Sequence, residues 1–334
     1  MASPLLELLL AAAAAALSWA LVGLYARVMT AWNRLEAPNE RSMHRVPVPV
    51  GAGLGMVATV VLLWPLSQIG ARAADAVLIA AFAALGAVSW IDDRRGLSPA
   101  VRLLAQAVAV SACLAWMPPE VRVLPALPLA LERLLLGVAW LWFVNLFNFM
   151  DGIDGLAGSE AVAIAMGYLV LAAYLGVGGP LVHLALIVAA ASVGYLVWNW
   201  HPARVFMGDA GSVPLGFVLG WLLIDLAVAG LWAAAAILPL YFAADATYTL
   251  LRRALRGEKP WQAHREHFYQ RAVLGGATPA GVAWRVGAAN AAFLALALVS
   301  TARPLAALAG AALVLALLLA ELARLARGAA HAAR

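Results

Sequence analysis

Apolar runs alternate with short polar segments along most of the chain. Each run is about 17–25 residues long, which is the length of a helix that crosses a lipid bilayer. The pattern therefore predicts eleven transmembrane helices, at roughly 5–26, 51–69, 75–91, 100–117, 134–150, 159–176, 180–198, 213–229, 231–250, 281–300 and 304–323. Because the intervening segments are too short for a soluble domain, we expect one polytopic membrane domain over residues 1–334, an all-α bundle of ten or eleven helices.

Composition supports a membrane protein. Hydrophobic residues make up 65% of the chain and charged residues only 12%, whereas soluble domains carry about 25% charged residues. The net charge of +5 requires no nucleic-acid partner, because basic loops beside anionic lipid explain it. The sole cysteine, Cys113, falls inside an apolar run, so we expect neither a disulfide nor a thiolate metal site.

The distribution of basic residues predicts the orientation. No Lys or Arg precedes the first apolar run and Arg27 follows it, so we expect a retained helix with its N-terminus outside rather than a cleaved signal peptide. Alternating the helices from there places 18 of the 22 Lys and Arg residues at the inner face, in agreement with the positive-inside rule. We therefore expect the C-terminus and the larger polar loops in the cytoplasm.

The polar stretch 145–155 separates two apolar runs and places Asn145, Asn148, Asp151 and Asp154 at a predicted helix end. The two acids would cost about 5–7 kcal/mol at the bilayer centre, and most of this cost disappears at a helix end that faces water. The two asparagines are three residues apart and share a helix face. The stretch therefore predicts a patch of two amides and two acids at the membrane surface.

Two further acidic segments fall on the same predicted face. Asp92 and Asp93 precede two arginines, as in a solvated turn or in a metal or phosphate site. The segment 198–212 combines an amide, a base, an aromatic ring, Asp209 and a small-residue turn whose N–H groups are suited to phosphate. The alternative for that segment is a polar loop whose tryptophans anchor the membrane interface, which leaves the small-residue turn unexplained.

Two basic segments complete the inner face. The first joins His44 to prolines and to three alternating glycines, a pattern that fits either a basic loop before a tightly packed helix or a ligand site. The longest inner loop carries His264, Arg265, His267 and Arg271, whose arginines alone would fit contact with anionic lipid. Two histidines, a tyrosine and a glutamine within the same eight residues favour a site instead.

Two acids lie inside apolar runs, where ionisable groups are paired or functional. Asp225 falls toward the predicted outer end of its helix, and we interpret it as structural. Asp245 falls near the inner end, and its role stays open between structure and function.

Proteins of other classes also form helical bundles in membranes. A secondary transporter places its ionisable groups near the bilayer midplane, whereas here the acids gather at one face. A non-catalytic assembly protein needs no such gathering of acids. An intramembrane prenyltransferase would carry an Asp-x-x-x-Asp spacing, which the sequence lacks.

Taken together, the motifs resemble those of the polyprenyl-phosphate N-acetylhexosamine-1-phosphate transferases of glycosyltransferase family 4. The matching motifs are Asp92-Asp93, the stretch 145–156 and the stretch 204–212, and the resemblance extends over about 41–271. The chain departs from many relatives at Val50, where they carry a basic residue. It also departs at His264-Arg265-Glu266-His267, which replaces an uninterrupted histidine cluster. The last departure favours the branch that initiates O-antigen synthesis over the phospho-muramoyl-pentapeptide translocase.

The resemblance implies a role for each group. Asp92, Asp93, His264 and His267 would be catalytic, with Asp92 favoured to deprotonate or position a lipid phosphate and with the roles of the two histidines open. The substrate-binding residues would be His44, Asn145, Asn148, Asp151, Asp154, Asn199, Arg204, Phe206, Arg265 and Arg271. Four of these, Asp151, Asp154, Asn199 and Phe206, would form a uridine pocket.

The implied reaction transfers a sugar-1-phosphate from a UDP-N-acetylhexosamine to polyprenyl (undecaprenyl) phosphate and releases UMP. Because two anions must meet, the site has to neutralise charge and align the reactants. Mg²⁺ suits this task, since it typically uses one or two carboxylates plus substrate phosphates, and Mn²⁺ is an alternative ion. Asp209 would be the direct ligand, with Asp92, Asp93 and Asp154 as further candidates.

The lipid-diphosphate-linked sugar would initiate a cell-surface polysaccharide, of lipopolysaccharide O-antigen or cell-wall type, at the bacterial inner membrane. The expected partners are the UDP-sugar, the polyprenyl phosphate and membrane lipid, with no nucleic acid and with a second copy of the chain as a candidate.

Overall fold

The computed structural model describes residues 4–35, 47–67, 73–259, 262 and 264–328. Within these residues the chain forms thirteen helices. They are α1 (Pro4–Ala31), α2 (Leu54–Leu66), α3 (Ala73–Arg95), α4 (Pro99–Trp116), α5 (Leu129–Phe149), α6 (Leu156–Leu175), α7 (Pro180–Asn199), α8 (Asp209–Val228), α9 (Trp232–Ile237), α10 (Leu240–Leu255), α11 (Phe268–Leu274), α12 (Pro279–Ser300) and α13 (Pro304–Ala326).

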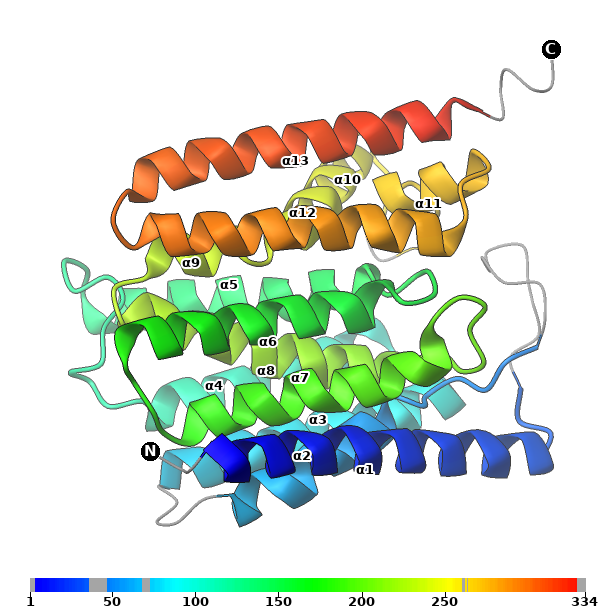
Figure 1. The fold of residues 1–334 in the computed structure, drawn as a ribbon, viewed down its shortest axis with the longest axis horizontal. Helices are drawn as coiled ribbons and strands as arrows, with labels where there is room; N and C mark the ends of the chain where they lie inside the picture. The colour runs from blue at the N-terminus through cyan, green and yellow to red at the C-terminus, as the bar shows by residue number, and fades with distance from the viewer. Residues whose placement is uncertain (1–3, 36–46, 68–72, 260–261, 263, 329–334) are drawn as a thin grey trace.

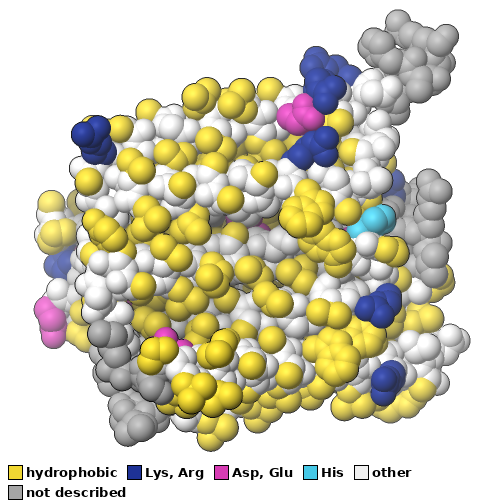
Figure 2. Space-filling model, in the orientation of Figure 1, with side chains coloured by type: hydrophobic (Ala, Val, Ile, Leu, Met, Phe, Trp, Pro, Cys, Tyr) yellow, Lys and Arg dark blue, Asp and Glu magenta, His cyan; other side chains and the backbone are white. Residues whose placement is uncertain are grey.

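The long helices lie side by side along one common direction (Figure 1). Nine helices in the described part of the chain are long and apolar enough to cross a membrane. The face of the molecule in Figure 2 is broadly apolar, and its Lys and Arg side chains gather toward the two ends of the bundle. The expected polytopic, all-helical membrane bundle is therefore confirmed.

Two of the expected helices differ from a full membrane span. The run at 51–69 forms only the 13-residue helix α2. The single helix expected at 231–250 is wrong, because this run forms the six-residue α9 and then α10, which continues to Leu255. Pro239 stands at the break, where its missing N–H and its ring interrupt the hydrogen bonds of a continuous helix.

The helix α8 is the centre of the bundle. Most of its side chains are buried, and it packs against α3, α5, α6 and α9. Trp140 on α5 stacks on Phe217 of α8 with ring centroids 4.7 Å apart and donates its indole N–H to the Phe217 carbonyl at 2.8 Å. The position of the α8 N-terminus is thus fixed by neighbours along its whole length.

The polar segments all lie at one end of the bundle, on the right in Figure 1. We call this the polar end, and it comprises segments 47–53, 92–98, 149–155, 200–209, 255–259 and 264–268. Backbone hydrogen bonds join the first and fourth of these segments, from Phe206 N to Pro49 O at 2.9 Å and from Ala52 N to Phe206 O at 3.0 Å. The structure therefore brings together segments that are far apart in the sequence, as the sequence predicts.

The contact between α1 and α7 depends on a glycine, and this generates a test of the fold. A Cβ at Gly194 would collide with the Ala15 carbonyl oxygen and lie 3.0 Å from Trp19 N. Gly194→Ala should lower the free energy of unfolding by about 1–3 kcal/mol, because one backbone has to move. The measurement is the thermal unfolding midpoint in detergent. Gly287→Ala on α12 is the control, since nothing lies within 4 Å of its Cβ position, and a midpoint lowered equally in both variants would contradict the α1–α7 contact.

Candidate active site

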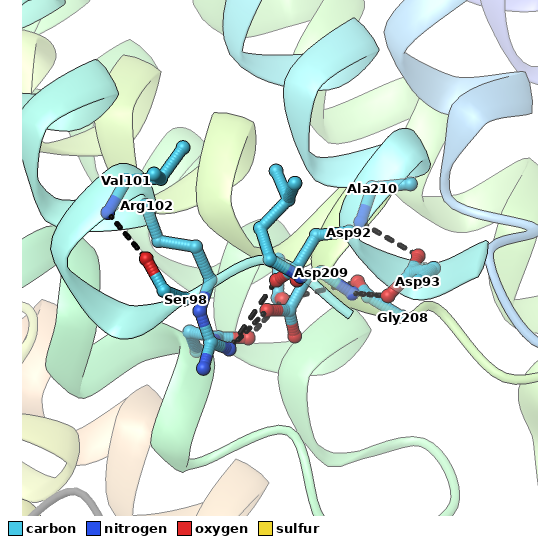
Figure 3. A network of polar contacts seen from close by, with 11 residues as sticks. Asp92, Asp93, Ser98, Val101, Arg102, Gly208, Asp209 and Ala210 are labelled. Atoms are coloured by element: carbon cyan, nitrogen blue, oxygen red, sulfur yellow. Dashed lines mark hydrogen bonds and ion pairs between the residues drawn. The ribbon is translucent and has the colours of Figure 1, made fainter. Parts of the chain in front are cut away.

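The N-terminus of α8 is capped by a carboxylate from another helix. Asp93, near the end of α3, accepts hydrogen bonds from Asp209 N at 2.9 Å and from Ala210 N at 3.0 Å (Figure 3). The first N–H groups of a helix have no partner within the helix, and the helix dipole favours a negative charge there. Asp93 therefore fixes where α8 begins.

Two glycines leave room for this carboxylate. Gly208 has a φ of +68°, and a Cβ there would lie 2.5 Å from Asp93 Oδ2. Gly51 has a φ of +87°, and its Cβ would lie 3.3 Å from the same oxygen. L-residues with side chains rarely adopt such φ values. The glycines of the first loop thus serve a close backbone approach around Asp93.

The small-residue turn after Gly208 does not present free N–H groups. Ala210 N donates to Asp93, while Gly211 N and Ser212 N donate to the Gly208 carbonyl at 3.0 and 3.1 Å. The expectation that these groups face a diphosphate is therefore wrong. The turn is the first turn of α8, and its small residues allow Gly211 to lie against Gly53.

Two further carboxylates, those of Asp92 and Asp209, meet beside this cap. Asp92 Oδ2 and Asp209 Oδ2 lie 3.2 and 3.4 Å from one guanidinium nitrogen of Arg102, on the first turn of α4 (Figure 3). The other Asp92 oxygen accepts from Leu97 N at 2.5 Å. Two like charges this close repel unless a cation joins them. Arg102 supplies that cation between the two carboxylates. We call Asp92, Asp209 and Arg102 the acid cluster.

The amides of α5 divide into two roles. Asn148 lies beside Asp209, and its Oδ1 accepts from Ser212 Oγ at 2.5 Å. Asn145, one turn earlier, donates its Nδ2 to Gln106 Oε1 on α4 at 2.7 Å. The structure therefore brings Asn148 to the acid cluster, whereas Asn145 joins α5 to α4.

The two acids of the α5–α6 loop also differ. Burial raises the pKa of Asp151 to about 7, with further contributions from the negative charges of Asp209 and Asp93. Asp154 instead accepts from His201 Nδ1 at 2.7 Å and from Ala203 N at 3.0 Å. Asp151 thus belongs electrostatically to the acid cluster, while Asp154 holds the loop that follows α7.

Hydrogen bonds of one buried asparagine stabilise the segment between α7 and α8. Asn199 is buried, accepts from Gly155 N and donates to Val205 O, both at 2.9 Å. Phe206 is half-buried, and its backbone pairs with Pro49 and Ala52 of the first loop. Arg204 turns away, donating to the Val197 carbonyl at 2.7 Å with its guanidinium 4.5 Å from the Trp198 ring centre. The structure does not bring Arg204 to the carboxylates.

The segment 264–271, which we call the histidine segment, contacts α10. Asp245 is fully buried and accepts from Phe268 N at 3.0 Å, and it lies 3.2 Å from His267 Nδ1. His267 in turn caps α11. Asp245 therefore anchors the N-terminus of α11, which is a structural contact. The interpretation of Asp225 as structural agrees with its hydrogen bond from Tyr168 Oη at 2.6 Å.

The docked segment also touches the α5–α6 loop. Tyr269 Oη donates to the Phe149 carbonyl at 3.1 Å, and a Cβ at Gly152 would collide with that hydroxyl. Burial and the neighbouring ring of His267 lower the pKa of His264 to about 4, so His264 is neutral at pH 7. The histidine segment therefore lies over the loop that carries Asp151.

The remaining predicted residues lie at the edge of the site or outside the described residues. Arg271 has its guanidinium 5.9 Å from the ring centre of Phe268, and Arg265 is partly exposed in the histidine segment. Glu266, between the two histidines, forms ion pairs with Arg253 and Arg256 at the end of α10. His44 lies outside the described residues.

The carboxylates fit Mg²⁺ only with help from a substrate. No group of three or more His, Cys, Asp or Glu side chains in the described residues could enclose a metal ion. Mg²⁺ needs fewer, because substrate phosphates and water complete its oxygen shell. Asp92 and Asp209 offer adjacent carboxylate oxygens where a guanidinium now holds the cation position, so the donor set is suitable.

The sequence did not single out Arg102 as a site residue. Its signal is present, however, because Ser98 caps α4 by accepting from Val101 N, Pro99 follows as the first helical residue, and Arg102 is then held in the first turn. An arginine so placed, ten residues after Asp92, returns to the acids when the chain reverses between α3 and α4. Gln106, the partner of Asn145, follows one turn later.

One family of known proteins matches the central part of the chain. Residues 76–227 match the family described as Glycosyl transferase family 4, a range that includes Asp92, Arg102, Asp151 and Asp209. Over these residues the chain is similar to glycosyl transferase family 4. The match ends before the histidine segment.

Curated relatives extend the similarity. The chain is 32% identical over 238 residues to the decaprenyl-phosphate N-acetylglucosaminephosphotransferase of Mycolicibacterium smegmatis, covering 60% of this chain and 58% of the relative. It is 35% identical over 217 residues to the phospho-N-acetylmuramoyl-pentapeptide-transferase of Thermosynechococcus vestitus, covering 58% and 53%. It is 28% identical over 260 residues to the probable undecaprenyl-phosphate N-acetylglucosaminyl 1-phosphate transferase of Bacillus subtilis, covering 72% and 70%. The chain thus spans little more than half the length of the first two relatives.

The raised pKa of Asp151 predicts a pH-dependent effect on stability. Its folded-state pKa of about 7 exceeds the value of about 3.9 in an unfolded chain, so the ionised carboxylate destabilises the fold. This cost is absent below about pH 4 and complete above about pH 7. In EDTA, Asp151→Asn should therefore raise the thermal unfolding midpoint at pH 8 and leave it unchanged near pH 4. The exposed Glu120→Gln is the control, and an equal shift of the Asp151 variant at both pH values would refute the prediction.

Proposed function

We propose that the protein transfers an N-acetylhexosamine-1-phosphate group from a UDP-sugar to a polyprenyl phosphate and releases UMP. The observation that carries this proposal is the Asp92–Arg102–Asp209 cluster at the polar end of a membrane bundle. A water-soluble nucleotide sugar and the phosphate of a membrane lipid meet at that depth. The printed names of the relatives, which act on decaprenyl phosphate, undecaprenyl phosphate or a muramoyl pentapeptide, support the same reaction class.

Asp209 and Asp92 would hold Mg²⁺, or alternatively Mn²⁺, against the diphosphate of the donor. The ion would neutralise the negative charge that develops on the departing UMP. Asn148 orients Asp209, and Asp93 fixes the helix end from which Asp209 projects. Asp93 therefore acts in this proposal by positioning Asp209. Both of its oxygens already accept backbone hydrogen bonds, so Asp93 is a weaker candidate for a metal ligand than Asp92 or Asp209.

The uridine would lie beside Phe206, with Asp151 at the other side of the pocket. Asp154 and Asn199 brace the pocket wall through their backbone bonds, which is a supporting role rather than direct reading of the base. His264, neutral at pH 7, is suited to hydrogen-bond a phosphate without adding charge. Arg265 and Arg271 are the nearest guanidinium groups of that segment for the donor.

Asp92 has two candidate roles toward the acceptor. It either deprotonates the lipid phosphate or, with Asp209, organises the metal. Its hydrogen bond from Leu97 N and its contact with Arg102 fix the carboxylate in place, which suits the second role.

We propose that all eleven apolar runs cross the membrane, with the polar end in the cytoplasm of a bacterial inner membrane. Trp64 on α2 donates to the Pro180 carbonyl at the far end of the bundle at 2.9 Å, so α2 connects the two ends despite its length. The pair α9–α10 leads from the far end back to Asp245 at the polar end. The sugar is of N-acetylhexosamine type, and the product would begin an O-antigen or another cell-surface polysaccharide.

The metal role of Asp209 generates the central test. Asp209→Asn keeps the side-chain size but removes the charge, so UMP release from UDP-N-acetylglucosamine and undecaprenyl phosphate should fall about 10³-fold or more. Asp225→Asn on the same helix is the matched control, because Asp225 pairs with Tyr168 at the far end. The unfolding midpoint confirms that each variant is folded. Turnover near the wild-type rate in folded Asp209→Asn would remove Asp209 as the ligand.

The proposed stacking of uridine on Phe206 is tested by donor binding. Phe206→Ala should weaken UDP binding by about 1–3 kcal/mol, the scale of a base stacked on an aromatic ring. Calorimetric titration of purified protein measures this directly. Trp116→Ala removes an exposed aromatic ring at the end of α4 opposite Arg102 and should leave UDP affinity unchanged. Equal affinities for wild type and Phe206→Ala would place the base elsewhere.

The orientation is tested by cysteine accessibility in a Cys113→Ala background. Gln262 and Ala126 are both exposed, in the polar-end loop and in the loop before α5. A membrane-impermeant thiol reagent should label Ala126→Cys in intact cells and Gln262→Cys only after permeabilisation. The reverse pattern would show that the polar end faces outward.

A further inference from the structure

A polar contact inside the bundle joins the C-terminal helices to α6. Glu160 on α6 and Asn290 on α12 are both buried, and Asn290 Nδ2 donates a hydrogen bond to Glu160 Oε2 at 2.7 Å. The two residues are 130 positions apart in the chain, and their helices pack against each other (Figure 1). The reaction proposed above uses neither side chain, so the contact needs an explanation of its own.

The hydrogen-bonding groups of this pair are satisfied only in part. Glu160 Oε1 and Asn290 Oδ1 are both buried, and neither has a hydrogen-bond partner among the described residues. A carboxylate oxygen and an amide oxygen only accept, whereas a protonated carboxyl group has an O–H donor. With a proton on Glu160 Oε1, the acid donates to Asn290 Oδ1 while its other oxygen accepts from Asn290 Nδ2. Both oxygens that lack a partner are then satisfied.

The surroundings of Glu160 supply no compensating positive charge. In the part of the chain that the structure describes, Glu160 takes part in no ion pair. Tyr241 of α10 lies near it, and the Tyr241 hydroxyl donates to Asp245 at 3.0 Å. An unpaired carboxylate is costly to bury in a membrane bundle, and a neutral carboxyl group with hydrogen-bond partners costs much less. The charge and the hydrogen bonds therefore both favour a neutral acid.

The pair connects two helices that continue into the candidate site. α6 begins directly after the loop of Asp151, and α12 follows α11, which carries the end of the histidine segment. α11 packs mainly on α13, and α13 packs on α12, so the position of α12 on α6 determines where α11 lies. At the polar end, Tyr269 of α11 donates to the Phe149 carbonyl. The C-terminal helices are thus attached beside the site and again within the bundle.

We propose that Glu160 is a neutral carboxylic acid that forms two hydrogen bonds with Asn290, and that this pair positions the histidine segment over the Asp151 loop. Both are positioning residues, because they act through the packing of α12 and α11 and not on a reacting group. The protonation of Glu160 is independent of the proposed function, whereas the effect of the pair on donor binding rests on that function.

Two substitutions at one position separate the proton from the hydrogen bonds. Glu160→Gln replaces the carboxyl O–H by an amide N–H, so both hydrogen bonds to Asn290 remain. Glu160→Leu removes them and leaves the buried amide without its partner. In purified full-length protein, Glu160→Leu should raise the amide hydrogen-exchange rate of residues 264–274 about tenfold, the scale of one buried hydrogen bond. Glu160→Gln should match wild type. Asn290→Ala, which removes the partner and keeps the acid, should reproduce the effect of Glu160→Leu.

Tyr168→Phe is the matched control, because it removes a hydrogen bond at the far end of the same helix. It should lower the unfolding midpoint without changing the exchange of residues 264–274. In the turnover assay, Glu160→Leu should raise the KM for UDP-N-acetylglucosamine about tenfold and leave the KM for undecaprenyl phosphate unchanged. Wild-type exchange and KM in folded Glu160→Leu would show that the pair only stabilises the bundle, which would overturn its positioning role.

Infrared spectroscopy tests the proton directly. The difference spectrum between wild type and Glu160→Gln at pH 7 should contain the C=O band of a protonated carboxyl group, which shifts in heavy water. The corresponding band should move in Asn290→Ala, because the acid has lost its acceptor. Carboxylate bands in the difference spectrum would show that Glu160 is ionised and would overturn the proposal.

The two proposals fail in distinguishable ways. If the exchange and infrared results are as expected but wild type releases no UMP, the Glu160–Asn290 pair stands and the proposed reaction is wrong. If wild type releases UMP but Glu160→Leu changes neither the exchange nor the KM for the UDP-sugar, the reaction stands and the pair does not position the histidine segment.

Discussion

The hydrogen bonds from the N-terminus of α8 to the Asp93 carboxylate are the contact on which the polar end depends. A single side chain joins α3 to the central helix, and the backbones at Gly51 and Gly208 close around it. Since Asp209 is the first residue of α8, the cap also sets the position of the carboxylate that faces the acid cluster. The N–H groups at the start of α8, which have no partner within the helix, and the helix dipole offset part of the cost of burying this carboxylate.

Acids that are equivalent by composition therefore have different physical roles. Asp93 accepts hydrogen bonds from two backbone N–H groups of α8. Asp154 holds the loop that follows α7, and Asp245 anchors α11. Asp92 and Asp209 share the guanidinium of Arg102, at the position where we propose that a metal ion binds. In the proposed function the chemistry is therefore confined to a small part of the acidic surface, and the other carboxylates hold the surrounding segments in place.

The broken helix pair α9–α10 serves the same frame. Because the chain restarts at Pro239, α10 reaches past the apolar run and presents Asp245 to the histidine segment. Tyr269 then connects that segment to the loop of Asp151 through the Phe149 carbonyl. The last third of the chain, which the family match does not cover, thereby closes over the site that the match does cover.

The sequence by itself determined the membrane-bundle class, the gathering of the polar motifs at one end and the candidacy of Asp92, Asn148 and Asp209. Hydropathy and the spacing of polar residues depend on local composition, so they can be read without coordinates. Eleven runs were recognisable, but whether 231–250 is one helix or two depends on how Pro239 packs, which no run length reveals.

The tertiary structure alone decided which acid does what. Asp92 and Asp93 are neighbours in sequence, yet on a helix they point in directions about 100° apart, toward Arg102 and toward the α8 N-terminus. Nor could spacing show that the N–H groups after Gly208 are already bonded, or that Arg102 returns to Asp92 and Asp209. Such partners come from distant segments, and only the packing of the helices brings them within hydrogen-bonding distance.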